Sequence, residues 1–426
     1  MTSISEKQLS ALWSMIDQAR GVASVLEVVE LLTLIVAAKA YEPEKLAAIG
    51  NMGAAHQKAE FEQLIEIVAT HFPTNVISAP SFIDSELLRH LLRQCHEINE
   101  LAVLIELVRF GLSRERHIFE ASSFANEQAL FKQLLGNTEE AVIYDGVAGV
   151  AATLASQPAK RLLLQDINSR TWQLGSRLLQ LQQKEFDYRL GNSLLNPAFS
   201  KAAADIVVMT PPMGLKLQGS DLEQLKQADY VLHDELKATI PMTAADSLWI
   251  QHALYHMNAN GKGYLLLAPG WLFRGGYDAA LREYLVEHEL IEAVIQLPAD
   301  FLSFTKVAPV ILVLNKARAK GSPVHLVDAQ DLGKMVGKNL QFTEDDAQIV
   351  AKLSQGALPE DSRFRAVYLP EIRDNDTCLA INRYFEKTLQ IAQADFAVEL
   401  TKLQQLQTDY MQAQHQLMAI YNKIKH

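Results

Sequence analysis

The stretch Asp205-Ile-Val-Val-Met-Thr-Pro-Pro-Met-Gly214 decides the fold of this chain. The apolar run after the aspartate is typical of a parallel strand that is covered on both faces. Pro211 and Pro212 then remove two backbone donors and fix φ, so neither a strand nor a helix continues. Ligands of open α/β sheets bind at the carboxyl ends of the strands. The corner therefore presents backbone carbonyls and the Thr210 hydroxyl to a ligand, although an ordinary strand exit also explains the tetrapeptide.

Short apolar runs alternate with helical segments over the middle of the chain. The runs are Ala141 to Asp145, Arg161 to Asp166, Asp187 to Asn192, Gly263 to Pro269, Ile291 to Pro298 and Val310 to Lys316. Strands that alternate with helices, such as the amphipathic stretch from Ser169 to Gln183, predict crossover connections and a parallel sheet. The polar segment from Leu215 to Thr243 follows the Pro-Pro corner directly. A mobile loop that covers a substrate would be useful there.

Composition limits the class of protein. The 426 residues are 49% hydrophobic and 21% charged, which is typical of a globular chain of two or three domains. The net charge of -11 argues against a chain that coats nucleic acid alone, but it allows a basic cleft or a partner that makes most contacts. Two cysteines, Cys95 and Cys378, predict neither a disulfide framework nor a metal cluster and fit a reducing cytoplasm. The apolar run from Val28 to Ala40 is too short to span a membrane.

Four segments are expected from these patterns. They are an N-terminal helical domain over residues 1–120, a catalytic α/β domain over 121–330, an extension over 331–385 and a long helix over 386–426. In the last segment two sets of residues repeat every seven positions, namely Leu403, Tyr410, Leu417 and Ile424 with Leu406, Ala413 and Ile420. This spacing favours a coiled coil with a helical partner over a helix that packs on its own domain.

A second candidate site follows the first strand. The turn Asp145-Gly-Val-Ala-Gly149 allows a ligand to approach the backbone, and Asp166 ends the next strand, where an acid can accept hydrogen bonds from ribose hydroxyls. Asp166 could equally cap the next helix. The chain lacks a Gly-x-Gly-x-x-Gly fingerprint and a Walker motif, and it lacks the spacings of a metal site. His252 lies in an apolar helical stretch and is expected to be a packed or capping histidine.

Taken in order, these residues resemble the modification subunits of type I restriction-modification systems, which are N6-adenine DNA methyltransferases. Asp145 to Ala152 stands where that family has Asp-Pro-Ala-Cys-Gly-Ser-Gly-Gly, and Gln165-Asp166 matches its acidic ribose position. Thr210-Pro-Pro-Met213 matches its Asn-Pro-Pro-Phe/Tyr. The most specific likeness is Gly261-Lys-Gly263 with Trp271-Leu-Phe-Arg-Gly-Gly276.

The resemblance implies a Rossmann-like, S-adenosylmethionine-dependent methyltransferase sheet with an N-terminal helical domain and a C-terminal coiled-coil helix. It implies S-adenosyl-L-methionine as the cofactor. No metal site is predicted, because the spacings of metal-ligating residues are absent. The implied partners are double-stranded DNA, a specificity subunit bound through the C-terminal helix, and a second modification-like subunit. The implied catalytic residues are Thr210, Pro211, Pro212 and Met213, and the implied cofactor-binding residues are Asp145, Gly146, Ala148, Gly149, Asp166, Ile167 and Asn192.

Two changes separate the corner from the family pattern. In the family, adenine N6 attacks the methyl group of the cofactor, and the Asn oxygen and a Pro carbonyl accept its two N–H groups while the aromatic stacks on the flipped base. Here Thr210 replaces the Asn and Met213 replaces the aromatic. Loss of one well-placed acceptor costs roughly 1–3 kcal/mol, and loss of a stacked aromatic costs about 1–3 kcal/mol per base.

The cofactor turn also differs from the family pattern. Val147 and Val150 add bulk, Ala151 stands where the family has a second Gly, and Asn192 stands where related enzymes often have an acid. Three hypotheses therefore stay open. The chain is an N6-adenine DNA methyltransferase subunit, or a non-catalytic descendant that binds DNA or a partner in a restriction or defence complex, or an enzyme that methylates an amine of a protein or RNA. S-Adenosylmethionine binding separates the first two.

Overall fold

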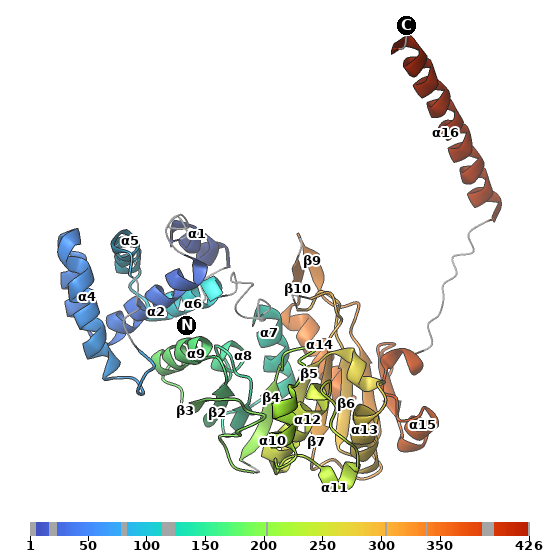
Figure 1. Cartoon of the computed structure of the whole chain (residues 1–426), viewed down its shortest axis with the longest axis horizontal. Helices are drawn as coiled ribbons and strands as arrows, with labels where there is room; N and C mark the ends of the chain where they lie inside the picture. Colours follow the sequence, from blue (N-terminus) through green and yellow to red (C-terminus); the bar gives the residue numbers. More distant parts are fainter. Residues whose placement is uncertain are drawn as a thin grey trace. The chain divides into compact units, whose positions relative to one another are not determined.

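The computed structural model describes residues 6–16, 24–77, 83–112, 124–201, 203–302, 305–337, 339–385 and 396–424. The chain divides into two compact units, Met1–Ile381 and Asn382–His426. The first unit contains an N-terminal group of helices and a large sheet with its covering helices (Figure 1). The predicted domain boundary near residue 120 lies outside the described residues and stays a prediction.

The N-terminal group is built around one almost completely buried helix. Its six helices are α1 (Glu6–Ile16), α2 (Val25–Tyr41), α3 (Pro43–Gly50), α4 (Ala54–Ala69), α5 (Ser85–His96) and α6 (Leu101–Leu112). Helix α2 begins at a capping box in which the Ser24 and Glu27 side chains each bond to the other residue's backbone. From Leu26 to Ala38 nearly every side chain of α2 is buried, which explains why its sequence shows no polar face.

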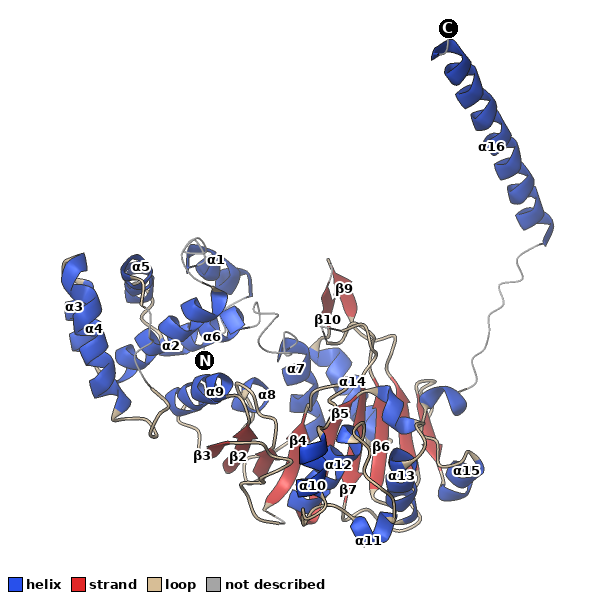
Figure 2. Cartoon of the chain, viewed as in Figure 1, coloured by secondary structure: helices blue, strands red, loops and turns tan. Residues whose placement is uncertain are grey.

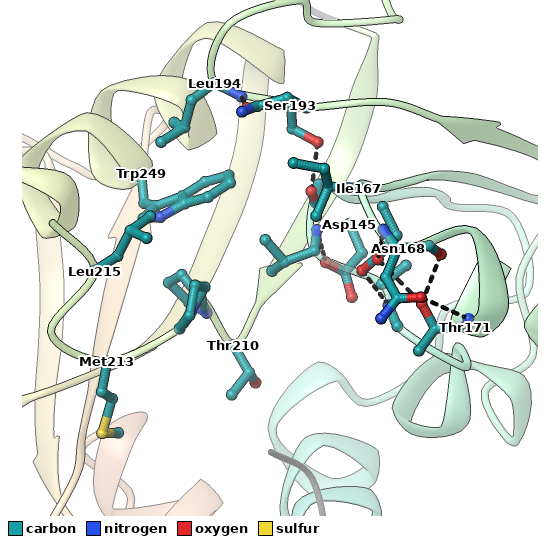
Figure 3. A pocket seen from close by; sticks show the side chains of 18 of the residues that line it. Asp145, Ile167, Asn168, Thr171, Ser193, Leu194, Thr210, Met213, Leu215 and Trp249 are labelled. Atoms are coloured by element: carbon teal, nitrogen blue, oxygen red, sulfur yellow. Dashed lines mark hydrogen bonds between the residues drawn. The ribbon is translucent and has the colours of Figure 1, made fainter. Parts of the chain in front are cut away.

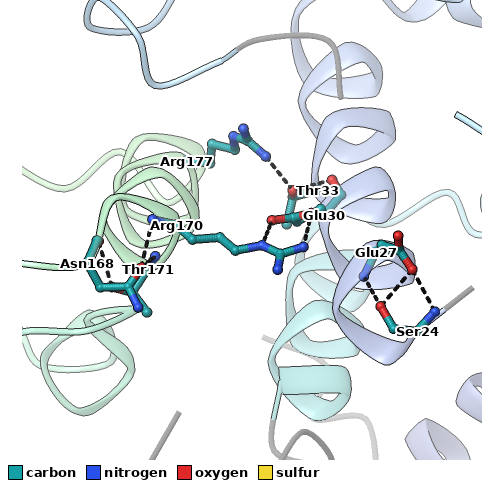
Figure 4. A network of polar contacts seen from close by, with 8 residues as sticks. All are labelled: Ser24, Glu27, Glu30, Thr33, Asn168, Arg170, Thr171 and Arg177. Atoms are coloured by element: carbon teal, nitrogen blue, oxygen red, sulfur yellow. Dashed lines mark hydrogen bonds and ion pairs between the residues drawn. The ribbon is translucent and has the colours of Figure 1, made fainter. Parts of the chain in front are cut away.

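Helix α9 (Ser169–Leu181) joins this group to the sheet. Its apolar side chains share one buried cluster with helices α1, α2, α5 and α6. The buried Arg177 donates to the backbone oxygen of Val76 at 2.9 Å and to the Thr33 hydroxyl at 3.2 Å. Arg170 makes a two-pronged ion pair with Glu30 of α2 (Figure 4). Helix α9, which follows the predicted ribose-binding residue Asp166, is therefore held in place by contacts with the N-terminal helices.

The main sheet has nine strands in the order β11-β8-β6-β7-β5-β4-β1-β2-β3. The strands are β1 (Val142–Asp145), β2 (Arg161–Asp166), β3 (Phe186–Leu190), β4 (Ala204–Met209), β5 (Met257–Leu267), β6 (Ile291–Gln296), β7 (Val310–Asn315), β8 (Val324–Asp328) and β11 (Phe364–Val367). All six predicted strand segments are present, and β2 has the predicted bounds. The α/β sheet that the resemblance implied is present.

The prediction of a parallel sheet from strand and helix alternation was wrong at two strands. Strand β7 runs antiparallel to both β5 and β6, and β11 runs antiparallel to β8. The chain between β6 and β7 carries no helix among its described residues, so it lacks the crossover that a parallel return needs. The other neighbours, including β1 with β2 and β4, are parallel as expected.

Helices cover both faces of the sheet (Figure 2). On β1, Ile143 belongs to the cluster that contains α7 (Phe124–Leu135), α8 (Ala152–Ala155) and α14 (Glu344–Ser354). The next residue, Tyr144, points to the other face and stacks on His256 of α12 (Ala245–His256), with ring centroids 4.2 Å apart. Helix α13 (Tyr277–Glu287) packs beside α12. Because both faces are covered, the strands read as continuous apolar runs.

The segment after the Pro-Pro corner is packed rather than an open loop. It contains two short helices, α10 (Gly219–Leu225) and α11 (His233–Leu236). Its apolar side chains Leu217, Leu225, Tyr230, Val231 and Leu236 are buried. Apolar residues spaced through this polar segment explain the packing, and Leu215, Lys216, Leu217 and Asp221 line the cavity described below. Its mobility as a covering loop stays a prediction.

Smaller elements complete the fold: the hairpin β9 (Lys334–Val336) and β10 (Asn339–Gln341), helix α15 (Leu369–Asp374), and the 3-10 turns η2 (Pro269–Leu272) and η3 (Ile381–Arg383). In the second unit, α16 (Phe396–Ile424) is the predicted long helix. Leu403, Leu406, Tyr410 and Leu417 of its seven-residue repeat are 55–68% exposed. The side chains of Ile420 and Ile424 are outside the described part of the chain. Among the helices that the structure describes, none is long and apolar enough to cross a membrane.

Candidate functional site

A cavity of about 570 Å³ lies at the carboxyl ends of β1, β2 and β4. Figure 3 shows two walls: one carries Asp145, Ile167 and Asn168, and the other carries Thr210, Leu215 and Trp249. The cavity brings together every residue that the sequence predicted for the site. These are Asp145, Gly146, Ala148, Gly149, Asp166, Ile167, Asn192, Thr210, Pro211, Pro212 and Met213. The two stretches that lie far apart in the sequence therefore form one site, although their chemical roles stay predictions.

The turn after β1 is held by its own side chains. The Asp145 carboxylate accepts the backbone N–H of Val147 at 2.9 Å. Gly146 has no room for a side chain, because a Cβ there would lie 2.8 Å from the Tyr144 hydroxyl oxygen. Gly149 has a φ of +54°, in the left-handed region that glycine tolerates without strain. Glycine is therefore required at 146 for lack of space and favoured at 149 by the backbone conformation.

The carboxylate of Asp166 links the ends of two neighbouring strands. One oxygen accepts the backbone N–H of Gly149 at 2.8 Å. The other accepts the N–H of Asn168 at 2.8 Å and the Thr171 hydroxyl at 3.1 Å. The helix cap that the sequence left as an alternative for Asp166 is instead supplied by Asn168, whose side chain accepts the N–H of Arg170. Asp166 therefore fixes the shape of the turn and still presents carboxylate lone pairs to the cavity.

The third strand closes this wall of the cavity. After β3, the Asn192 side chain accepts the N–H groups of Leu194 and Leu195 at 3.1 and 3.2 Å. The buried Ser193 hydroxyl donates to the carbonyl of Gly146. The Tyr188 hydroxyl donates to the carbonyl of Gly149. Most of the polar contacts on this side therefore fix backbone positions, and the predicted residue Asn192 is among them.

The opposite wall is the Pro-Pro corner. The Thr210 hydroxyl donates to the carboxylate of Glu127 at 3.2 Å. Met213 lines the cavity, but in Figure 3 its side chain points away from Trp249 and Asp145, and it packs against the apolar cluster under the sheet. The residue that replaces the family's aromatic is therefore partly engaged in the core.

Glu127 is a site residue that sequence reasoning missed. It lies in the first turn of α7, is only 2% exposed and lines the cavity. Burial raises the pKa of its carboxyl to about 7, and the hydrogen bond from Thr210 opposes this shift. Glu127 belongs to no recognisable sequence motif, so the sequence alone did not mark it as a site residue. The fold places it next to Thr210.

A second missed residue is Trp249 of α12. In Figure 3 its side chain belongs to the wall that carries Thr210 and Leu215, and the residue is 4% exposed. Its indole nitrogen is buried and has no hydrogen-bond partner in the described part of the chain. Its neighbour His252 is fully buried and shares a 2.7 Å hydrogen bond with the Tyr144 hydroxyl, so the expectation of a packed histidine is confirmed.

Two of the departures in the cofactor turn, at Val150 and Ala151, have different consequences. Val150 is 3% exposed and packs in the buried cluster shared with the N-terminal helices. Much of its larger side chain therefore fills space in the core. Ala151 has a φ of +55°, a conformation that costs a residue with a Cβ roughly 1–2 kcal/mol. The family's glycine at this position thus has a conformational reason, and alanine is accommodated here with strain.

The electrostatics of the cavity favour a cationic ligand. Among the described residues, its lining includes the carboxyl groups of Glu127, Asp145, Asp166 and Asp221 and one ammonium, that of Lys216. Burial raises the pKa of Asp145 to about 8. The nearby carboxyl groups Asp166 and Glu127 add to this rise. A ligand with positive charge would relieve this repulsion.

S-Adenosylmethionine fits the site on these observations. It carries a positive sulfonium, two ribose hydroxyls and a flat adenine ring. The cavity offers carboxylates, acceptors at Asp166 and apolar surface from Ile167 and Leu194. Its volume lies in the range of sites that hold such molecules.

Together, the sheet order and the cavity at its carboxyl edge define the S-adenosylmethionine-dependent methyltransferase fold. A crystal structure of a type I restriction-modification system methyltransferase subunit from Streptococcus thermophilus shares this fold. It has a TM-score of 0.73 at 18% identity and covers 90% of this chain and 100% of that one.

The chain belongs to the N-6 DNA methylase family, whose sequence model matches residues 129–392. The type I restriction enzyme MpnII methylase subunit of Mycoplasma pneumoniae is 27% identical over 194 residues, which are 46% of this chain and 35% of that protein. The HindI methylase subunit of Haemophilus influenzae is 27% identical over 233 residues, which are 52% and 51%. The chain thus spans between about a third and about half the length of these relatives, and the resemblance to type I modification subunits is confirmed.

Proposed function

We propose that this chain is the S-adenosylmethionine-dependent, N6-adenine-specific DNA methyltransferase subunit of a type I restriction-modification-like system. The observation that carries the proposal is the single cavity that contains both the predicted cofactor residues and the Thr210-Pro-Pro-Met213 corner. A methyl donor and an extruded base must meet within bonding distance, so a shared cavity is the geometry that this reaction needs.

The cofactor is assigned to the wall formed by β1, β2 and β3. Asp166 would accept the ribose hydroxyls, and the turn from Gly146 to Gly149 would lie against the methionine part. Asn192 and Ile167 would flank the adenine ring. When bound, S-adenosylmethionine supplies an electrophilic methyl group on a positive sulfur. The positive sulfur would favour ionisation of Asp145, and the resulting carboxylate would stabilise that charge.

The target adenine is assigned to the corner wall. The Thr210 hydroxyl oxygen and the Pro211 carbonyl would each accept one N–H of the exocyclic amine, while Pro212 keeps the corner rigid. Acceptors placed in this way withdraw the nitrogen lone pair from the ring and make it more nucleophilic. Because Met213 points away, Trp249 would be the aromatic side chain against which the base packs, since it is the one aromatic residue among the described residues that line the cavity.

The partners follow from charge and from the exposed helix. A net charge of -11 is unsuited to binding DNA alone, so a specificity subunit would supply many phosphate contacts and the target sequence. Its docking element is α16, whose repeat of apolar residues is exposed. A second modification-like subunit completes the proposed assembly, which acts in the cytoplasm.

Calorimetry and methyl transfer test this proposal in two steps. The full chain is titrated with S-adenosylmethionine, and transfer of a labelled methyl group to duplex DNA is then measured with and without a specificity subunit. We expect one cofactor per chain and N6-methyladenine in the product. Absence of binding at millimolar cofactor would remove the enzyme proposal, and label on protein or RNA alone would redirect it.

A second candidate is a non-catalytic descendant that retains the scaffold to bind DNA or a partner. Two observations favour it, namely the Thr at position 210 and the orientation of the Met213 side chain. On this account, cofactor binding is absent or silent, and the complex binds DNA without methylating it. The same two measurements separate the candidates.

A further inference from the structure

The Thr210 hydroxyl at the Pro-Pro corner donates to the buried carboxylate of Glu127 at 3.2 Å. Thr210 follows β4, and Glu127 projects from α7, on the face of the sheet opposite α12. Within the described residues, the Thr210 hydroxyl is the only hydrogen-bond partner of the Glu127 carboxylate. A nearly fully buried carboxyl with one neutral partner costs folding free energy, which suggests a purpose beyond packing.

We propose that Glu127 and Thr210 act as a pair in which Glu127 orients the threonine hydroxyl toward the carboxylate and accepts a proton through it. In this pair, Thr210 touches the substrate amine and Glu127 is the positioning residue behind it. The inference rests on the proposed methyl transfer to an amine, and it assigns to the pair the acceptor function of the family's asparagine.

The orientation follows from hydrogen-bond chemistry. A hydroxyl has one donor and two acceptor lone pairs, and its proton rotates to suit its surroundings. While the ionised Glu127 accepts that proton, both lone pairs of the Thr210 oxygen are available to the N–H groups of an incoming amine. Once Glu127 is protonated, its own O–H can donate to Thr210 and occupy one of those lone pairs. Ionised Glu127 is therefore the active form.

The proton balance of the reaction gives the pair its second task. The nitrogen lone pair forms the new N–C bond as the C–S bond breaks, and the sulfur keeps that electron pair and becomes neutral. The nitrogen then carries a positive charge and must lose one proton. Thr210 accepts this proton while it passes its own proton to Glu127, and the neutral carboxyl later releases it to water.

The charges around Glu127 favour this sequence. Facing the cavity are Asp145 after β1, Asp166 after β2, Asp221 on α10 and the ammonium of Lys216. Burial raises the Glu127 pKa to about 7, so the group can accept and release a proton at neutral pH. A positively charged methyl donor would favour its ionised form.

The test uses three variants of the full chain. Glu127→Gln keeps a hydrogen-bonding side chain but accepts no proton, Thr210→Val removes the hydroxyl at similar volume, and Thr210→Ser restores it. Glu140→Gln is the matched control, because it removes one exposed carboxyl close to β1. Single-turnover methyl transfer to DNA, with a specificity subunit present, is measured between pH 5.5 and 8.5.

We expect wild type, Thr210→Ser and Glu140→Gln to show rates that rise with pH through the titration of Glu127. Glu127→Gln should lose about 10- to 100-fold in rate, should lose this rise, and should retain its affinity for S-adenosylmethionine. Difference infrared spectra should place the Glu127 carboxyl at a higher pKa in Thr210→Val, because the hydroxyl no longer stabilises its ionised form.

An unchanged rate and pH profile in Glu127→Gln, with an active wild type, would overturn the pair and leave the proposed function intact. An unchanged Glu127 titration in Thr210→Val would also overturn it. A wild type that transfers no methyl group to DNA would remove the proposed function and the pair together. The activity of the wild type separates failure of the proposed function from failure of the pair, and the infrared titration tests the hydrogen bond within the pair directly.

Discussion

The two walls of the cavity are stabilised in different ways. On the cofactor side, Asp145, Asp166 and Ser193 bond to backbone groups of the turns and thereby fix the ends of three adjacent strands. At the corner, Thr210 has one side-chain hydrogen bond, to Glu127. Where backbone hydrogen bonds fix the wall, substitution of neighbouring side chains leaves its shape intact. Where a single side chain contacts the substrate, its substitution changes the site unless a neighbouring residue compensates.

This difference explains how a chain can depart from the family pattern at both walls with unequal consequences. The bulk of Val150 is taken up by the core, and Ala151 adds local strain. At position 210 the predicted hydrogen-bond acceptor for the base is a threonine hydroxyl in place of an asparagine amide. The hydrogen bond to the buried Glu127 carboxylate orients that hydroxyl. Four sets of substitutions test this contrast.

Replacing Asp166 by Ala should weaken S-adenosylmethionine binding at least 100-fold, or about 3 kcal/mol, because it removes the ribose acceptor and the contact to Gly149. Asp166→Asn should weaken cofactor binding less than Asp166→Ala does, since one acceptor oxygen remains. Calorimetry measures both. If Thr210→Val weakened the cofactor equally, the two walls would not be separate sites.

Replacing Glu127 by Gln should stabilise the empty chain at pH 8 but not at pH 4. The folded state binds this proton more tightly than the unfolded state, so its stabilising contribution is lost as the pH rises from about 4.5 to about 7. The free energy of unfolding of the variant should exceed that of the wild type by roughly 1–3 kcal/mol above pH 7. Urea denaturation at both pH values tests it, and a pH-independent difference would argue against a buried, titrating carboxyl.

Combining Thr210→Asn with Met213→Phe should raise methyl transfer by about 10-fold if the corner is only weakened. The amide can donate to Glu127 while its oxygen accepts from the base. Because an amide does not relay a proton, the pH dependence of the rate should flatten. Methylation of DNA by wild type and variant is compared at pH 6 and 8, and activity that stays at zero would point to the cofactor wall.

Replacing Ala151 by Gly should change the free energy of unfolding by less than about 1 kcal/mol. Relief of the positive φ is offset by the loss of a buried methyl group and by the greater freedom of the unfolded chain. Gly149→Ala, at a similar φ, should instead be destabilising by roughly 1–2 kcal/mol. Thermal unfolding of the two variants compares the positions directly.

The sequence predicted features that depend on local chemistry. Apolar runs identified the strands, and the Pro-Pro pair after β4 identified the edge where the cavity lies. All the predicted site residues line that cavity, because residues after parallel strands share one edge of the sheet.

Features that depend on distant pairing were not predictable. The antiparallel β7 and the packed segment with α10 and α11 follow from connections whose lengths and contacts no local pattern encodes. Glu127 and Trp249 belong to helices on opposite faces of the sheet, and nothing in their neighbours marks them as cavity residues. Their contribution appears only when the chain is folded.

A crystal structure of the full chain soaked with S-adenosylmethionine would show whether cofactor and corner share one site. We expect density with the ribose hydroxyls on Asp166 and the methyl group directed toward Thr210. Density for the cofactor outside this cavity, or a methyl group facing away from residue 210, would contradict it.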